Sequence, residues 1–165
     1  MCVISPHLAG LFSLNLLDLS GNWFLSIPRH LPPSVQQLYL SNNTLSGLDE
    51  DSFVGFLNLK YLRLSHCGLQ SHGVHPQAFN FSSLVELDLS YNKLTTIPTV
   101  PTTLQYLYLE ANKIQGEIHT YSRQACTYTD TNAVTFHTNN DEVSLTFPHM
   151  HTLMHFTIQQ CTHFL

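Results

Sequence analysis

Basic residues are scarce in this sequence, with only six lysines and arginines among 165 residues against eleven aspartates and glutamates. Nucleic-acid binding needs clustered basic side chains that contact phosphates, so this scarcity argues against such a partner. No apolar run reaches the roughly 20 residues of a membrane-spanning helix. The first residues also lack the basic segment, apolar stretch and cleavage site of a signal peptide, so we expect any such leader to lie outside this sequence.

Cysteine is too sparse, and too irregularly spaced, for a small disulfide-stapled domain: there are four, at Cys2, Cys67, Cys126 and Cys161. No CxxC pair, glycine-rich phosphate loop or nucleophile-elbow motif is present. The sequence therefore predicts neither a cofactor nor an enzymatic activity.

Leucine, in contrast, is abundant but confined to one part of the chain. Residues 1–115 contain 24 leucines and 6 threonines, whereas residues 116–165 contain 3 leucines, 10 threonines and 6 of the 11 histidines. We interpret residues 1–13 as the end of a preceding partial repeat, residues 14–115 as a repeat array and residues 116–165 as a non-repeat tail that is poorly structured or an artefact of the gene sequence.

The array consists of five copies of the pattern LxxLxLxxNxL, which start at residues 14, 35, 59, 84 and 104. Such spacing is typical of a leucine-rich repeat. In each LxL the two leucines point to one side of a short strand, while the residues between and beside them point to the other side. The sequence thus predicts an α/β-type solenoid, a curved horseshoe with a concave parallel sheet and an irregular or 3-10 convex side.

Asparagine recurs at the turn after each strand, where one amide can both donate and accept hydrogen bonds. Asn22, Asn43, Asn92 and Asn112 take this position, and Cys67 takes it in the third repeat. We interpret Cys67 as a buried residue of this asparagine ladder, with a reactive thiol or a disulfide as the alternative.

The segment LRLSHCGLQSHGVHPQAFNFSSLVELDLSYNKLTTIPTV, with Ile-Pro steps at residues 27–28 and 97–98, resembles the central repeats of the small leucine-rich proteoglycans of class II. The resemblance covers roughly residues 8–115. It implies a secreted glycoprotein of the extracellular matrix that binds fibrillar collagen, modulates fibril assembly and carries N-linked, often keratan-sulfate, chains.

The chain departs from that family at both ends. The four-cysteine segment before the repeats is missing, and the sequence after Gln115 contains no further repeat. Cys126 and Cys161 are 35 residues apart, roughly the spacing of the family's last cysteine pair, but nothing between them matches, so we favour coincidence over a disulfide. The tail's His149, His151 and His155, with Cys161 and His163, match no closed metal site, so no metal is predicted.

Two sequons are consistent with secretion: Asn42-Asn43-Thr44 and Asn80-Phe81-Ser82. Asn80 is the stronger candidate for glycosylation because it matches a glycosylated position of the family. Both remain candidates.

The outward strand positions form the candidate ligand surface on the concave face. We predict that ligand contacts come from Asp18, Tyr39, Tyr61, Arg63, Glu86, Asp88, Tyr106, Tyr108 and Glu110. The partner implied by the resemblance is fibrillar collagen or another extracellular protein. The alternatives are a ligand-binding fragment of a leucine-rich-repeat receptor ectodomain and a truncated product without function.

Overall fold

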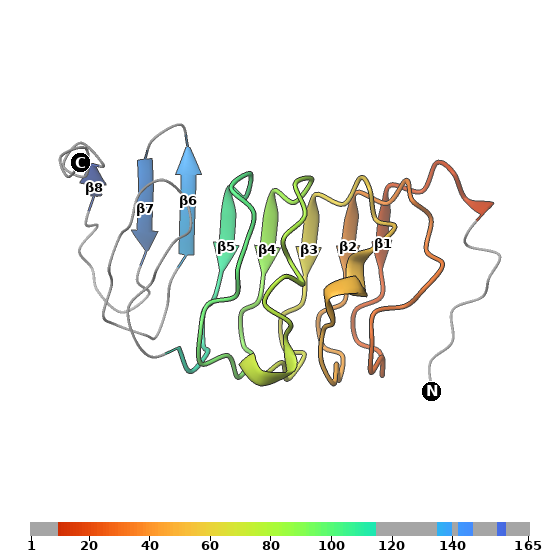
Figure 1. The fold of residues 1–165 in the computed structure, drawn as a ribbon, viewed down its shortest axis with the longest axis horizontal. Coiled ribbons are helices and arrows are strands. Elements are labelled where there is room, and N and C mark those ends of the chain that lie inside the picture. Colours follow the sequence, from red (N-terminus) through yellow and green to blue (C-terminus); the bar gives the residue numbers. More distant parts are fainter. Residues whose placement is uncertain (1–9, 115–134, 140–141, 147–154, 158–165) are drawn as a thin grey trace.

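The computed structural model describes residues 10–114, 135–139, 142–146 and 155–157 of the chain. Its main part is a solenoid whose coils stack side by side, each contributing one short strand to a single sheet (Figure 1). The five repeat strands pair in parallel and in chain order: β1 (Leu16–Asp18), β2 (Gln37–Tyr39), β3 (Tyr61–Arg63), β4 (Glu86–Asp88) and β5 (Tyr106–Tyr108).

The inward leucines set the register of the sheet. The central residues of the repeat strands lie opposite one another, in the order Leu17, Leu38, Leu62, Leu87 and Leu107. Leu38, Leu62 and Leu87, which have a coil on both sides, have no exposed surface. Because a slip of one residue would turn every leucine outward, the LxL pattern permits only this pairing. The predicted leucine-rich-repeat solenoid is confirmed.

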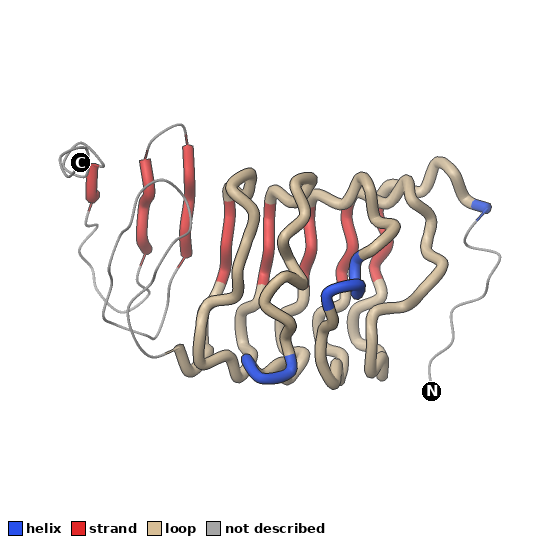
Figure 2. The backbone as a smooth tube through the Cα atoms, viewed as in Figure 1, coloured by secondary structure: helices blue, strands red, loops and turns tan. Residues whose placement is uncertain are grey.

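The convex side carries two 3-10 helices, η2 (Glu50–Phe53) and η3 (Ser71–Gly73), and otherwise loops (Figure 2). Phe53 packs between Phe56, Phe79 and Phe81, with ring centroids 5.7–6.2 Å apart. Gly47 and Gly73 let adjacent coils approach closely, since a Cβ on Gly47 would lie 2.6 Å from the Gly73 carbonyl oxygen.

The turn that follows each strand passes through the left-handed region of the backbone map. The residue directly before each ladder position has a φ between 51° and 68°: Gly21, Asn42, His66, Tyr91 and Ala111. Non-glycine residues seldom adopt this conformation. Here the stacked neighbours impose it, because each turn must present its next residue to the core.

The ladder that follows satisfies backbone groups of two coils at once. Asn92 donates to the carbonyls of Leu89 (2.9 Å) and Leu64 (2.8 Å) and accepts from the N–H groups of Cys67 (3.1 Å) and Leu69 (3.0 Å). Asn43 and Asn112 repeat the pattern, and all three are buried. Asn22, in the first coil, is exposed and bonds only to its own turn. The predicted ladder role is confirmed for Asn43, Asn92 and Asn112, whereas Asn22 does not join two coils.

Cys67 replaces the amide in the third coil. Its thiol donates to the Leu40 carbonyl at 3.2 Å, and the side chain is free and 2% exposed. Burial raises the pKa of this thiol. The ladder interpretation of Cys67 is therefore confirmed. Cys2, Cys126 and Cys161 lie outside the described residues.

Three strands in the non-repeat tail continue the sheet beyond β5: β6 (Thr135–Asn139), β7 (Glu142–Thr146) and β8 (His155–Thr157). They pair antiparallel, starting with β6 against β5. The sequence did not predict them, because this segment lacks the leucine pattern. The pairing has a general cause, since an open edge strand presents backbone groups that another strand can satisfy. Within the described ranges, no helix is long and apolar enough to cross a membrane.

Replacing a buried ladder amide is expected to destabilise the fold strongly. Asn92→Ala leaves buried carbonyl and N–H groups of two coils without partners, which we expect to lower the free energy of unfolding by roughly 3–4 kcal/mol. Asn22→Ala is the matched control and should cost less than about 1 kcal/mol, because its bonds are exposed and local. Denaturant unfolding of the full chain measures both. Equal losses would contradict the ladder's role between coils.

The buried thiol should make stability fall at alkaline pH. An unfolded cysteine ionises near pH 8.5, about its usual value, whereas folded Cys67 keeps its proton to higher pH. The unfolded state therefore loses its proton first, and the free energy of unfolding should decline as pH rises above about 8.5. The control is Cys67→Ser, which cannot ionise in this range, so the difference between the two proteins should depend on pH. Parallel pH profiles would refute the effect.

Candidate functional site

The outward positions of the repeat strands form two aligned rows on the concave face. One row runs from β1 to β5 through Asp18, Tyr39, Arg63, Asp88 and Tyr108, and the other through Leu16, Gln37, Tyr61, Glu86 and Tyr106. Two residues beyond the end of each strand lie Ser20, Ser41, Ser65, Ser90 and Glu110. We call these residues the concave stripe. Because the register is parallel throughout, side chains of neighbouring strands lie next to each other along each row.

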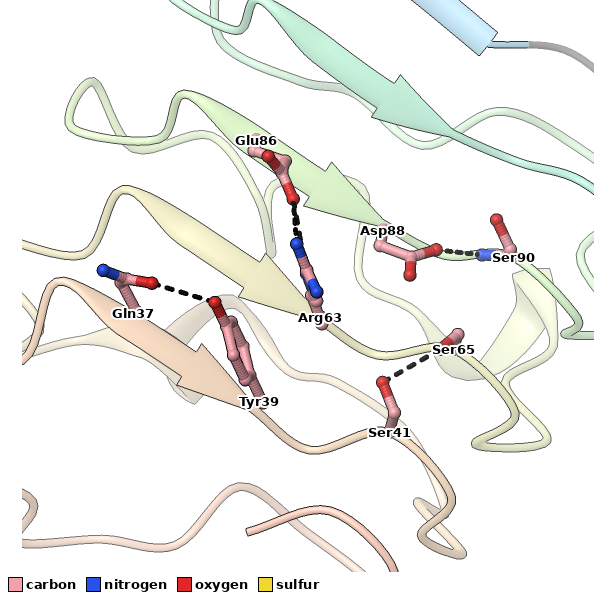
Figure 3. Close-up of polar contacts among 8 residues, drawn as sticks. All are labelled: Gln37, Tyr39, Ser41, Arg63, Ser65, Glu86, Asp88 and Ser90. Carbon is pink, nitrogen blue, oxygen red and sulfur yellow. Dashed lines mark hydrogen bonds and ion pairs between the residues drawn. The ribbon is translucent and has the colours of Figure 1, made fainter. Parts of the chain in front are cut away.

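Four side chains at the centre of the concave stripe are joined into one network across β2, β3 and β4 (Figure 3). The Tyr39 hydroxyl donates to Gln37 Oε1 at 2.8 Å. The Arg63 guanidinium lies over the Tyr39 ring, 4.7 Å from its centroid. Arg63 also pairs with Glu86 Oε1, from Nη2 at 3.2 Å and from Nε at 3.3 Å.

This network fixes the orientation of Arg63 more than it stabilises the fold. The Arg63 side chain is 47% exposed and that of Glu86 14% exposed, and ion pairs open to water contribute little to stability. Stacking on Tyr39 and two bonds to one carboxylate nevertheless hold the planar guanidinium in a defined place. The central part of the concave stripe is therefore ordered before any ligand arrives.

Asp18 and Asp88 occupy the same row but are held differently from Glu86. Each accepts the backbone N–H of the serine two residues later at 2.9 Å, Asp18 from Ser20 and Asp88 from Ser90. The bond from the Ser20 backbone, followed by that from its hydroxyl, lowers the pKa of Asp18. The Asp-Leu-Ser sequence thus builds the same small turn in the first and fourth repeats.

The last repeat strand brings two further tyrosines to the concave stripe. Burial raises the pKa of Tyr108, and the Glu86 carboxylate adds to that shift. Strand β6 lies along β5, so that Tyr106 and Tyr108 are opposite His137 and Thr135 in the register. The predicted contact residues of β5 therefore have a further strand beside them, which the repeat pattern could not indicate.

A ring pair at the end of the strands was not found by sequence reasoning. His66 and Tyr91 stack with their centroids 4.3 Å apart and their planes 12° from parallel. Both occupy the left-handed turn position of their repeats, just beyond Ser65 and Ser90. The signal in the sequence was their shared place in the repeat, since equivalent positions of adjacent coils are spatial neighbours.

The two sequons lie on different parts of the solenoid. Asn42 is exposed in the turn after β2, next to the concave stripe. Asn80 is exposed on the convex side, where its amide donates to Gln77 Oε1 at 2.7 Å. Among the residues whose side chains are described, no group of three or more histidines, cysteines or carboxylates is placed to hold a metal ion. The histidines and Cys161 considered for a metal in the tail lie outside that set.

Comparison with known families identifies the repeats. A family model of the leucine rich repeat matches residues 13–69, and a second matches residues 58–81 and 83–102. Lumican of Mus musculus is 50% identical over 112 residues, which are 68% of this chain and 33% of that protein. Lumican of Homo sapiens is 49% identical with the same coverage, and fibromodulin of Bos taurus is 46% identical over 111 residues, 67% of this chain and 30% of that protein. The chain thus spans about a third of the length of these relatives.

Solved structures agree on the fold. A chain in the octameric complex of Latrophilin 3 (Lec, Olf), Unc5D (Ig, Ig2, TSP1) and FLRT2 (LRR) superposes with a TM-score of 0.64 at 30% identity, covering 68% of this chain and 35% of that one. A chain of the LRIM1/APL1C complex gives 0.51 at 29% identity, covering 70% and 21%. Lumican and fibromodulin are secreted proteins of the extracellular matrix, so the predicted location is confirmed.

Strands β4 and β5 are neighbours, so the charge of Glu86 should have a measurable effect on the pKa of Tyr108. Glu86→Gln removes a negative charge that disfavours the tyrosinate, so the pKa of Tyr108 should fall, while burial should still keep it above its usual value. Titration of the tyrosine ring signals by NMR measures this. Glu50→Gln, in the 3-10 helix η2, removes the same charge far from β5 and is the control variant, which should leave the pKa of Tyr108 unchanged. An unchanged Tyr108 would show that the carboxylate is too far away or too well screened.

Proposed function

Because this chain is a leucine-rich-repeat protein of the lumican and fibromodulin kind, we propose that it binds fibrillar collagen through the concave stripe and modulates fibril assembly. The observation that carries the proposal is the ordered network of Gln37, Tyr39, Arg63 and Glu86 at the centre of that stripe. The network serves no packing need of the core, which the leucines fill from the opposite side of the strands.

The shape of the concave stripe suits a long partner. Five parallel strands contribute equivalent positions, so contacts can repeat from coil to coil along one direction. The proposed contacts from one end to the other are Asp18, Tyr39, Tyr61, Arg63, Glu86, Asp88, Tyr106, Tyr108 and Glu110. A rod such as a collagen triple helix extends over many residues and can contact several of these coils at once.

Side-chain chemistry supports a partner with basic groups. Among the proposed contacts, four carboxylates outnumber the single guanidinium, which Glu86 already pairs. Lysine and arginine side chains of a partner would therefore meet a complementary charge. Tyr39, Tyr61, Tyr106 and Tyr108 offer large contact areas with few rotatable bonds, so their ordering on binding costs little entropy.

Glycosylation at Asn80 and Asn42 forms the second part of the proposal. Asn80 lies outside the strands, away from the concave stripe, so a glycan there leaves that stripe accessible. Chains of keratan sulfate on such a glycan would point away from the bound fibril. Asn42, in contrast, borders the concave stripe, so a glycan at that position would reduce the space for a ligand.

The test compares matched pairs of substitutions in the full chain, secreted behind an added signal peptide. Asp88→Asn with Tyr61→Ala alters the concave stripe, while Asp51→Asn with Leu57→Ala alters the convex side by the same loss of charge and the loss of one large side chain. Binding to reconstituted collagen fibrils should weaken by about 1–3 kcal/mol for the concave pair only. Thermal unfolding confirms that both variants are folded. If both pairs weaken binding equally, or neither does, the concave stripe is not the collagen site.

A further inference from the structure

A hollow of about 770 Å³ lies on the convex side, between the loop before β4 and the loop before β5. It is lined by Pro76, Gln77, Asn80, Ser82, Thr99, Val100, Pro101, Thr102 and Thr103. The hollow has a simple origin in the repeat lengths. The third repeat spans 25 residues from Leu59 to the start of the next, while the fourth spans only 20. The shorter coil leaves a step beside the longer one.

Both ends of the Asn80-Phe81-Ser82 sequon line this hollow, and the middle residue holds the sequon in place. The Phe81 ring lies 5.7 Å from that of Phe53 and packs against the core. The backbone is bonded on both sides, from the Asn80 N–H to the Gln77 carbonyl at 3.0 Å and from the Leu84 N–H to the Phe81 carbonyl at 3.2 Å. Asn80 is thus fixed at the rim of the hollow rather than at a loose loop tip.

The lining has the chemistry of a carbohydrate subsite. The hydroxyls of Ser82, Thr99, Thr102 and Thr103 and the amide of Gln77 can bond to sugar hydroxyl and N-acetyl groups. Pro76, Val100 and Pro101 offer apolar surface to the face of a pyranose ring. The volume is within the roughly 300–1,000 Å³ of small-molecule sites.

We propose that this hollow receives the first sugars of an N-glycan attached to Asn80, so that the glycan core is part of the folded surface. Attachment joins Nδ2 of Asn80 to the anomeric carbon of the first sugar, breaks that carbon's bond to the phosphate of a lipid diphosphate donor and releases one amide proton. One N–H remains on Nδ2, as a donor for Gln77. The proposal rests on the glycosylation proposed above, and not on collagen binding.

The experiment uses the full chain with Thr44→Ala, secreted by mammalian cells behind an added signal peptide. Thr44→Ala removes the Asn42 sequon and leaves Asn80 as the single N-glycan site. Mass spectrometry should find Asn80 modified. An endoglycosidase then trims the glycan to one N-acetylglucosamine. NMR should show nuclear Overhauser contacts between the N-acetyl methyl group and the methyl groups of Val100 and Thr102. An unmodified Asn80, or a sugar without contacts to residues 99–103, would overturn the proposal.

A second variant tests directly whether the sugar occupies the hollow. Val100→Tyr fills the hollow and should displace the sugar, so that enzymatic release of the intact glycan from the native chain becomes several-fold faster than in the Thr44→Ala parent. Val54→Tyr, at an exposed convex position away from the hollow, should leave the rate unchanged. Equal rates in all three proteins would mean that the glycan does not occupy the hollow. Collagen binding is measured before and after the glycan is trimmed and should be the same. A sugar without contacts to the hollow would overturn this proposal alone, and absence of collagen binding would overturn only the collagen proposal.

Discussion

The fold depends on satisfying the backbone at the end of each very short strand. Three-residue strands leave most of every coil without regular pairing, and buried carbonyl and N–H groups without partners are costly. The asparagine ladder meets this need, since one amide such as Asn92 joins the turn of its own coil to the backbone of the preceding coil. The coils can stack around the leucine core only because the hydrogen bonds of these turns are satisfied. The residues of the concave stripe are evenly spaced because each stacked coil contributes one strand.

The repeated features of the fold could be read from the sequence. Each coil meets the same physical demands, so the inward leucines and the ladder amides recur at fixed spacing. The left-handed turn position was missed, although it also recurs. Its residues, among them His66, Tyr91 and Ala111, share no side-chain property that would reveal a backbone requirement. The pairing of β6 with β5 was missed as well, because antiparallel pairing of an edge strand follows no template in the repeats.

The candidate site was predictable only as a set of positions. The alternation of inward and outward residues identified which side chains belong to the concave stripe. The rotamers that bring Arg63 over Tyr39 and against Glu86 depend on three coils of different length, and no pattern within one repeat contains that information. The hollow beside Asn80 could not be predicted from one repeat either, because it results from the difference in length between two neighbouring coils.

The close approach of Gly47 to Gly73 affects the curvature between the second and third coils. Leu48 and Val74 form a parallel bridge there, and the Leu48 N–H donates to the Gly73 carbonyl at 2.8 Å. The second and third coils are therefore as close at this bridge as paired strands are in a sheet, about 4.8 Å apart. A solenoid curves only where its coils are farther apart on the convex side than on the concave side. The two spacings are similar at this bridge, so the solenoid curves little between these two coils. A side chain at residue 47 would push the second and third coils apart on the convex side and increase the curvature of the solenoid. A straight, rod-shaped ligand would then contact fewer coils.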